Sequence, residues 1–166
     1  MEYEGMVDGG YLDVTDKIEE CRYFLDLMTR TTDWNQFRWL TSAFLNAARA
    51  TLDCFAMSAH YAIQGDGPFE MESDDDAIAT LRKYLAIKQE KKTGKVYVSP
   101  LDPLLKDLCD HRRVTAHEGS LWIKPESVTN VQQFEFALGD TPVVPFAKDV
   151  LGLLTSIQRE LRPDLY

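Results

Sequence analysis

The sequence predicts an all-α protein: a bundle of four to five helices with a small β-hairpin before the last helix. Apolar residues recur every three or four positions through several long segments. Capping residues and Pro or Gly stops bound these segments. Of the 166 residues, 45% are apolar and 27% are charged, as in a globular domain with a core. We expect a single domain over residues 1–166, with residues 1–13 as a flexible acidic N-terminus.

The first helix is predicted to begin near Asp16 and to end around Thr31. Asp16 and Glu19 have the spacing of a capping box, in which each side chain satisfies a free backbone N–H group. Apolar residues three or four positions apart then define one buried face. These residues are Ile18, Cys21, Leu25 and Met28.

The second and longest helix is predicted from Thr32 or Asp33 to about Ile63, where residues 64–68 (QGDGP) stop it. It is apolar around most of its circumference, as a central helix should be. One narrow band is polar: Asn35, Ser42, Asn46, Arg49, Asp53 and His60. This band is either the solvated side of the helix or a polar groove. In a groove, Arg49 and Asp53 would form an ion pair, and its burial would serve a site more than stability.

A third helix is predicted from the acidic cap at residues 73–76 to Gly94, with lysines in its last turns. The fourth starts at Ser99–Pro100 or Asp102–Pro103, because Pro suits the first turn, and reaches the region 112–119. Its buried face is expected to contain three leucines: Leu101, Leu105 and Leu108.

The pattern changes after the fourth helix. Phe134, Phe136 and Leu138 alternate with other residues, and Gly139–Asp140 provides a turn before Val143–Val144, which indicates a small hairpin. A last helix is expected from about Pro145 to Leu161.

Composition also narrows the class of protein. No apolar run approaches the roughly 20 residues that span a bilayer, and the acidic N-terminus lacks the layout of a signal peptide. Three cysteines without a C-x-x-C pair suggest reduced, buried thiols. The histidines lack metal-ligand spacing. We therefore expect a cytoplasmic protein with no membrane association, no cofactor and no metal.

Charge is distributed unevenly along the chain. The net charge of −9 argues against a protein that coats nucleic acid through a broad basic surface. Within residues 82–95, however, basic residues cluster, either as a solvated helix face or as a contact for RNA. The candidate nucleic-acid-binding residues in this cluster are Lys88, Lys91 and Lys92.

The most informative stretch is 112–117 (RRVTAH). Arg112 lies near the leucine face of its helix and needs an acceptor, because a guanidinium stays ionised. His117 is five residues later, about 140° away on a regular helix. The two residues can act together only if the helix ends or bends between them, or if a second copy supplies one. Thr115 and Gly119 favour an early helix end.

A histidine and an arginine suit metal-free RNA cleavage. His117 would move a proton between the ribose 2′-hydroxyl and the leaving oxygen. Arg112 would stabilise negative charge on the phosphate, and Asp53 or Glu118 would orient either side chain. The alternative is structural, with Arg112 in a salt bridge and His117 at a helix end.

Residues 37–50, with the core SAFLNAARA, are similar to the second helix of bacterial HEPN-like proteins. The run from Arg112 to His117 lies two helices later, where that superfamily has its R-x4–6-H motif. The resemblance covers roughly residues 14–120. It implies an up-and-down helical bundle that often dimerises, bringing two motifs together across a cleft. Many members resemble metal-independent ribonucleases of toxin and defence systems, while others bind nucleotides or partner proteins.

One residue departs from the family pattern. Arg113 stands where a polar residue, typically Asn, commonly follows the motif arginine. Arg113 is only four residues before His117, so Arg112 remains the better match. The catalytic candidates are thus Arg112 and His117, with Arg49, Asp53, Arg113 and Glu118 in support.

Two main functions are expected from these observations. The first is a homodimeric, metal-independent RNase or a relative that has lost activity. The second is a non-catalytic helical module that binds a nucleotide or a protein partner. A homo-oligomeric structural protein without a ligand is a third.

Overall fold

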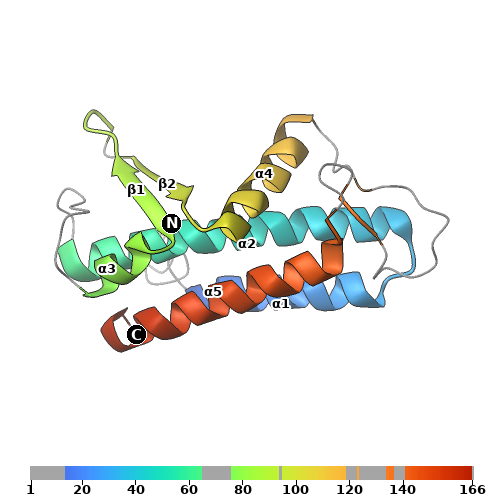
Figure 1. Cartoon of the computed structure of the whole chain (residues 1–166), viewed down its shortest axis with the longest axis horizontal. Coiled ribbons are helices and arrows are strands. Elements are labelled where there is room, and N and C mark those ends of the chain that lie inside the picture. The colour runs from blue at the N-terminus through green and yellow to red at the C-terminus, as the bar shows by residue number, and fades with distance from the viewer. Residues whose placement is uncertain are drawn as a thin grey trace, which may run out of the picture.

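The computed structural model describes residues 14–64, 76–93, 95–118, 123, 134–136 and 141–165. Within them the protein is mostly helical, with one small antiparallel hairpin. The elements are α1 (Val14–Arg30), α2 (Trp34–Gln64), α3 (Asp76–Arg82), β1 (Leu85–Gln89), β2 (Val96–Pro100), α4 (Pro103–Glu118) and α5 (Val143–Leu165). Figure 1 shows α1 and α5 running along one side of α2, with α4 and the β1–β2 hairpin on the other.

Helices α1 and α2 confirm the predicted elements to within about two residues. The buried residues of α1 include the four predicted ones and Val14. A short connection separates the helices, and Asp33 caps α2, because its Oδ1 accepts a hydrogen bond from the Gln36 backbone N–H at 2.7 Å.

The core lies where α1, α2 and α5 pack together. Phe44, Leu52 and Phe55 of α2 are fully buried, as are Leu154 and Ile157 of α5. Each such side chain stabilises the fold by about 1.5–3 kcal/mol through removal of apolar surface from water. The other elements pack against this layer of three helices.

The prediction of one helix from residue 73 to Gly94 is wrong. Helix α3 ends at Arg82, and the next residues form β1, which pairs with β2. Ile87 and Val98 are a buried cross-strand pair, whereas the neighbouring pair Lys88 and Tyr97 is exposed. This alternation with period two is the signature of a half-buried strand. Burial of one face against α2 favours a strand over a helix here.

The hairpin predicted directly before the last helix is present as a short antiparallel pairing. The Phe136 N–H donates to the Thr141 carbonyl oxygen at 2.8 Å, and the Val143 N–H donates to the Phe134 carbonyl oxygen at 2.9 Å. The described residues there form isolated bridges, Ile123 with Phe136 and Glu135 with Pro142. Val143 and Val144 begin α5 instead of a strand, because Pro145 is favourable in a first helical turn. Leu138 and Gly139–Asp140 lie outside the described residues, as do residues 1–13.

Helix α4 starts at the second of the two predicted openings. Asp102 Oδ1 accepts hydrogen bonds from the backbone N–H groups of Leu104 at 2.8 Å and Leu105 at 3.3 Å. Leu105 and Leu108 are fully buried as predicted. Leu101 precedes the helix and is 46% exposed, so its placement on the buried face was wrong.

The three cysteines form no disulfide with one another. Cys21 and Cys54 are buried as predicted, and burial raises the pKa of the Cys21 thiol to about 12. Cys109 is only partly buried. In the part of the chain that the structure describes, no helix combines the length and the apolar character needed to cross a bilayer.

Candidate functional site

The polar band of α2 meets α4 and β2 at one junction. Asn46, Arg49 and Asp53 lie three and four residues apart and therefore project from one side of α2. On α4, Cys109 and Arg112 are three residues apart and face them. The band is neither wholly solvated nor a buried groove: Asn46 and Asp53 are exposed, whereas Arg49 is mostly covered.

Arg49 connects three elements. Its guanidinium donates hydrogen bonds to Cys109 Sγ at 3.2 Å and to the Val98 carbonyl oxygen at 2.8 Å. It also forms the predicted ion pair with Asp53, at 3.3 Å. Only 22% of its side chain is exposed. Because its charge and donors are used within the protein, Arg49 positions α2, α4 and β2 relative to one another.

Arg112 is held differently. Its Nε donates a hydrogen bond to Asn46 Oδ1 at 3.2 Å, and the side chain is exposed instead of lying among the leucines. Within the described residues, its two terminal nitrogens have no hydrogen-bond partner. An arginine fixed at Nε presents a planar fork that matches the geometry of a phosphate or carboxylate.

Asp53 and Arg113 modify the charge around Arg112. Partial burial raises the pKa of the Asp53 carboxyl above its ordinary value of 3.8, while the charges of Arg49 and Arg112 oppose this shift. Arg113 forms an ion pair with Asp110 at 3.2 Å on its own helix, and both side chains are exposed. Arg49, Asp53 and Arg112 together carry one net positive charge when Asp53 is ionised, so the junction favours an anion.

Helix α4 continues without a break as far as Glu118, so the early helix end near Thr115 does not occur. The backbone positions of Arg112 and His117 are therefore about 140° apart around the helix. The side chains of His117, Glu118 and His60 lie outside the described part of the structure. Of the predicted site residues, the structure brings together Arg49, Asp53 and Arg112. The backbone position of His117 lies on a different side of α4 from that of Arg112.

The candidate lysines lie on the hairpin and not on a helix. Lys88 belongs to β1, and Lys91 and Lys92 lie in the turn that follows it. All three are exposed. Tyr97 of β2, which the sequence interpretation did not select, is opposite Lys88 and is 47% exposed.

His111 occupies the opposite side of α4 and anchors the helix. Its ring stacks on Phe136, with centroids 3.9 Å apart, and meets the edge of Phe146 at 5.3 Å. Burial lowers the pKa of His111 below its ordinary value of 6.5, although Asp107 and Asp110 favour the charged form. No spacing in the sequence indicates this aromatic contact, because its partners are 25 and 35 residues away.

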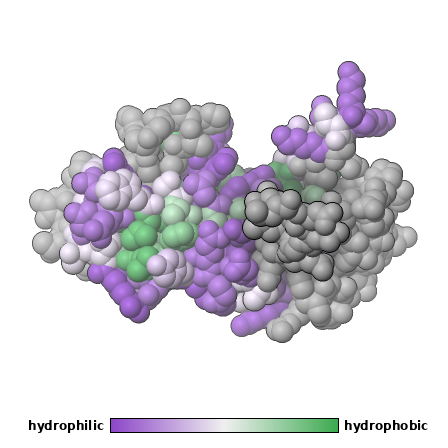
Figure 2. Space-filling view, turned by 180° about the vertical axis from the view of Figure 1, so that it is seen from behind, coloured by the Kyte–Doolittle hydropathy of each residue, from purple (hydrophilic) through white to green (hydrophobic). Residues whose placement is uncertain are grey.

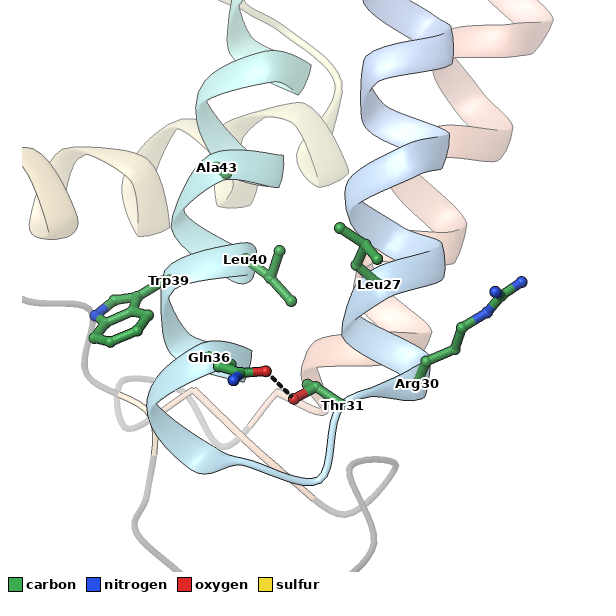
Figure 3. Close-up of a pocket in the computed structure, with 7 residues that line it drawn as sticks. All are labelled: Leu27, Arg30, Thr31, Gln36, Trp39, Leu40 and Ala43. Atoms are coloured by element: carbon green, nitrogen blue, oxygen red, sulfur yellow. Dashed lines mark hydrogen bonds between the residues drawn. The ribbon is translucent and has the colours of Figure 1, made fainter.

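Trp39 is a second residue that the sequence interpretation missed. It is 62% exposed and precedes Asn46 by seven residues, which places both on one side of α2 about 10 Å apart along the axis. Figure 3 shows its ring turned to the side of α2 away from α1. The seven-residue spacing between Trp39 and Asn46 was the signal in the sequence that could have identified Trp39.

An apolar hollow of 590 Å³ lies between the end of α1 and the start of α2. Figure 2 shows apolar side chains exposed at this end of the molecule, and in Figure 3 Leu27 and Leu40 point toward one another while Arg30 points away. The hydroxyl of Thr31 donates to Gln36 Oε1 at 3.1 Å beside them. The hollow is lined by Leu27, Arg30, Thr31, Gln36, Trp39, Leu40 and Ala43, and these residues offer no thiol, carboxylate or imidazole.

Among the residues that the structure describes, no group of three or more His, Cys, Asp or Glu side chains is arranged to hold a metal ion. The described chemistry is therefore that of two guanidinium groups, a carboxylate and exposed aromatic rings. The chain was compared with protein-family models, curated proteins and solved structures, and none of them matched.

Proposed function

We propose that this protein binds RNA and that Arg112 holds one of its phosphates. The observation that carries the proposal is the exposed Arg112 fork, fixed at Nε by Asn46 and open at both terminal nitrogens within the described residues. Charge-assisted bonds from such a fork to a phosphate are about twice as strong as neutral hydrogen bonds. The HEPN resemblance of residues 37–50 and of the Arg112–His117 run supports the same class of ligand.

The surroundings of Arg112 favour an extended ligand over a free anion. Trp39 lies on the same side of α2 as Asn46, about 10 Å along the axis, and its exposed ring suits stacking with a base. The net charge of −9 repels nucleic acid from most of the surface, so a locally positive junction also directs where RNA can approach.

A second candidate function is metal-independent RNA cleavage by a pair of copies. Its specific support is the unbroken α4, in which the backbone positions of Arg112 and His117 are about 140° apart around the helix axis. Figure 1 shows the C-terminal turns of α4 leading away from α2. In a two-fold dimer, His117 of one copy would transfer the proton and Arg112 of the other would stabilise the phosphate.

RNA binding is tested by fluorescence anisotropy with a labelled single-stranded RNA of mixed sequence. Arg112→Ala is expected to weaken binding about tenfold, equivalent to ~1.4 kcal/mol. Arg113→Ala is the matched control. It removes the same charge at the next residue, where the arginine side chain is already paired with Asp110. It should change the affinity less than twofold. No binding by the parent protein, or equal losses in both variants, would overturn the proposal.

Cleavage is tested separately in EDTA with the parent, Arg112→Ala, His117→Ala and an equimolar mixture of the two variants. If each site takes one residue from each copy, a mixed dimer keeps one intact site. The mixture should then regain about a quarter of the parent activity, as two-fold symmetry requires. Cleavage by the parent without recovery in the mixture would reject the shared site, and an inactive parent would leave RNA binding as the function.

A further inference from the structure

We infer that the β1–β2 hairpin is a platform for single-stranded RNA, in which Tyr97 stacks with an unpaired base and Lys88 and Lys95 contact the flanking phosphates. This inference rests on the proposed function, since it names the class of RNA and a second contact surface. Lys88 and Tyr97 are cross-strand partners and both are exposed.

Two lysines are neighbours of Tyr97 on the exposed face of the hairpin. Lys88 is opposite Tyr97 on β1, and directly opposite residues on one face of a hairpin have Cβ atoms about 5 Å apart. The Lys95 ammonium lies over one face of the ring, 5.4 Å from its centroid. An exposed ring with two neighbouring lysines combines a stacking surface with cations for phosphate contacts, which are the two components of single-strand recognition.

The charge of the hairpin is opposite to that of the protein. Residues 85–100 contain four lysines and one glutamate, a net charge of +3, within a chain of net charge −9. The four lysines are exposed: Lys88, Lys91, Lys92 and Lys95. A positive element on an acidic body attracts a polyanion and orients it toward that element.

Hydrogen bonds in the turn hold the two strands of the platform together. In the turn, Thr93 donates a hydrogen bond to Glu90 Oε2 at 2.5 Å and accepts one from the Lys95 N–H at 3.2 Å. The Glu90 N–H also donates to the Lys95 carbonyl oxygen at 2.9 Å. Beneath the platform, Ile87 and Val98 are buried. A rigid platform loses little conformational freedom on binding, which favours affinity.

Arg49 connects the platform to the Arg112 site. It donates to the carbonyl oxygen of Val98, the neighbour of Tyr97, and to Cys109, one turn before Arg112. The two surfaces are thus held in a constant relation by one side chain. A flexible single strand can contact both, and a base must be unpaired to stack on Tyr97.

A purely electrostatic partner such as an acidic peptide fits less well. It would use the lysines but would gain nothing from the ring of Tyr97, because a carboxylate is repelled by the negative face of an aromatic ring. The combination of ring and cations therefore favours nucleic acid.

The test measures the affinity of the intact protein for a labelled single-stranded RNA, for the same RNA as a duplex, and for polyglutamate as a competitor. Tyr97→Ala is expected to weaken single-strand binding about tenfold, the loss of one stacked base. Tyr97→Phe should stay within twofold of the parent, because the ring is retained. Tyr23→Ala is the matched control, since Tyr23 is 61% exposed and lies on α1, outside the hairpin. It should bind like the parent.

The lysines give an independent measurement. Lys88→Ala and Lys95→Ala should each weaken binding and reduce the slope of log affinity against log salt by about 0.7, as one lost phosphate contact predicts for a single strand. Circular dichroism melting curves verify that every variant is folded. An unchanged salt slope in both variants would contradict the assigned phosphate contacts.

The outcomes separate this inference from the proposed function. If Arg112→Ala weakens binding but Tyr97→Ala does not, the platform is refuted and RNA binding at Arg112 stands. Duplex RNA that binds as tightly as the single strand, or polyglutamate that competes equally well, would also refute the platform. A parent protein that binds no RNA refutes both.

Discussion

The two sides of α2 have different chemistry. Toward α1 and α5, α2 packs its large apolar side chains into a core that includes Phe44, Phe55 and Leu154, all fully buried. Toward α4 and the hairpin, α2 makes polar contacts. Arg49 of α2 donates a hydrogen bond to the Val98 carbonyl oxygen of β2, and Asn46 of α2 accepts one from Arg112 of α4. The α1–α5 side thus contributes mainly apolar packing, whereas the α4–hairpin side combines packing with groups that can bind. Three measurements test this division.

The largest expected effect is on the α1–α5 side. Phe44→Ala should lower the free energy of unfolding by about 3–5 kcal/mol, because it removes a fully buried ring and leaves a cavity. Leu101→Ala, at a residue 46% exposed on the other side of the molecule, should cost less than about 0.5 kcal/mol. Denaturant unfolding measures both. Comparable losses in the two variants would show that stability is not confined to the core side.

The next effect compares the two arginines of the polar side. Arg49→Ala should lower the free energy of unfolding by about 1–3 kcal/mol, because the Val98 carbonyl oxygen loses its hydrogen bond in a mostly covered position. Arg112→Ala should change it by less than about 0.5 kcal/mol, since Arg112 is exposed. RNA affinity should respond in the opposite order, with a larger loss in Arg112→Ala than in Arg49→Ala. If Arg112→Ala destabilises the fold as much as Arg49→Ala, Arg112 is a structural residue.

The smallest effect is the pH response of His111. Burial holds the pKa of His111 below 6.5 in the folded protein, so the unfolded chain takes up the proton first as the pH falls. Stability that is fully present above pH 6.5 should decrease as the pH falls toward the pKa of the folded state. His111→Phe keeps a ring to stack on Phe136 and should flatten this dependence relative to the parent. Equal pH slopes in chemical denaturation between pH 7 and 5 would show that His111 does not contribute.

Local sequence signals predicted the long helices well. The spacing of Ile18, Cys21, Leu25 and Met28 described a face that is buried, and Asp33 and Asp102 cap the helices that they precede. These features depend on hydrogen bonds and side-chain spacing within a few residues, so no knowledge of distant contacts was needed.

The hairpin was missed because its signals were ambiguous. The lysines after Lys88 suit the last turn of a helix as well as an exposed β-turn. Residues 85–89 are too few to distinguish the two periodicities by themselves. Burial of Leu85, Ile87 and Val98 against the helical layer decided between them.

The candidate site was predicted in part. The pairing of Arg49 with Asp53 follows from their separation by one helical turn. The bond from Arg112 to Asn46 joins residues 66 positions apart, and the bond from Arg49 to Val98 joins residues 49 apart. No local pattern specifies such contacts.

The sequence by itself determined which segments form α1, α2, α4 and α5 and which polar residues share a side of α2, because both follow from the geometry of a single helix. Only the tertiary structure decided that Arg49 is consumed by internal bonds while Arg112 remains exposed. It also decided that residues 85–100 are a hairpin whose face joins Tyr97 with Lys88. The physical reason is that the burial of a side chain depends on which distant elements pack against it.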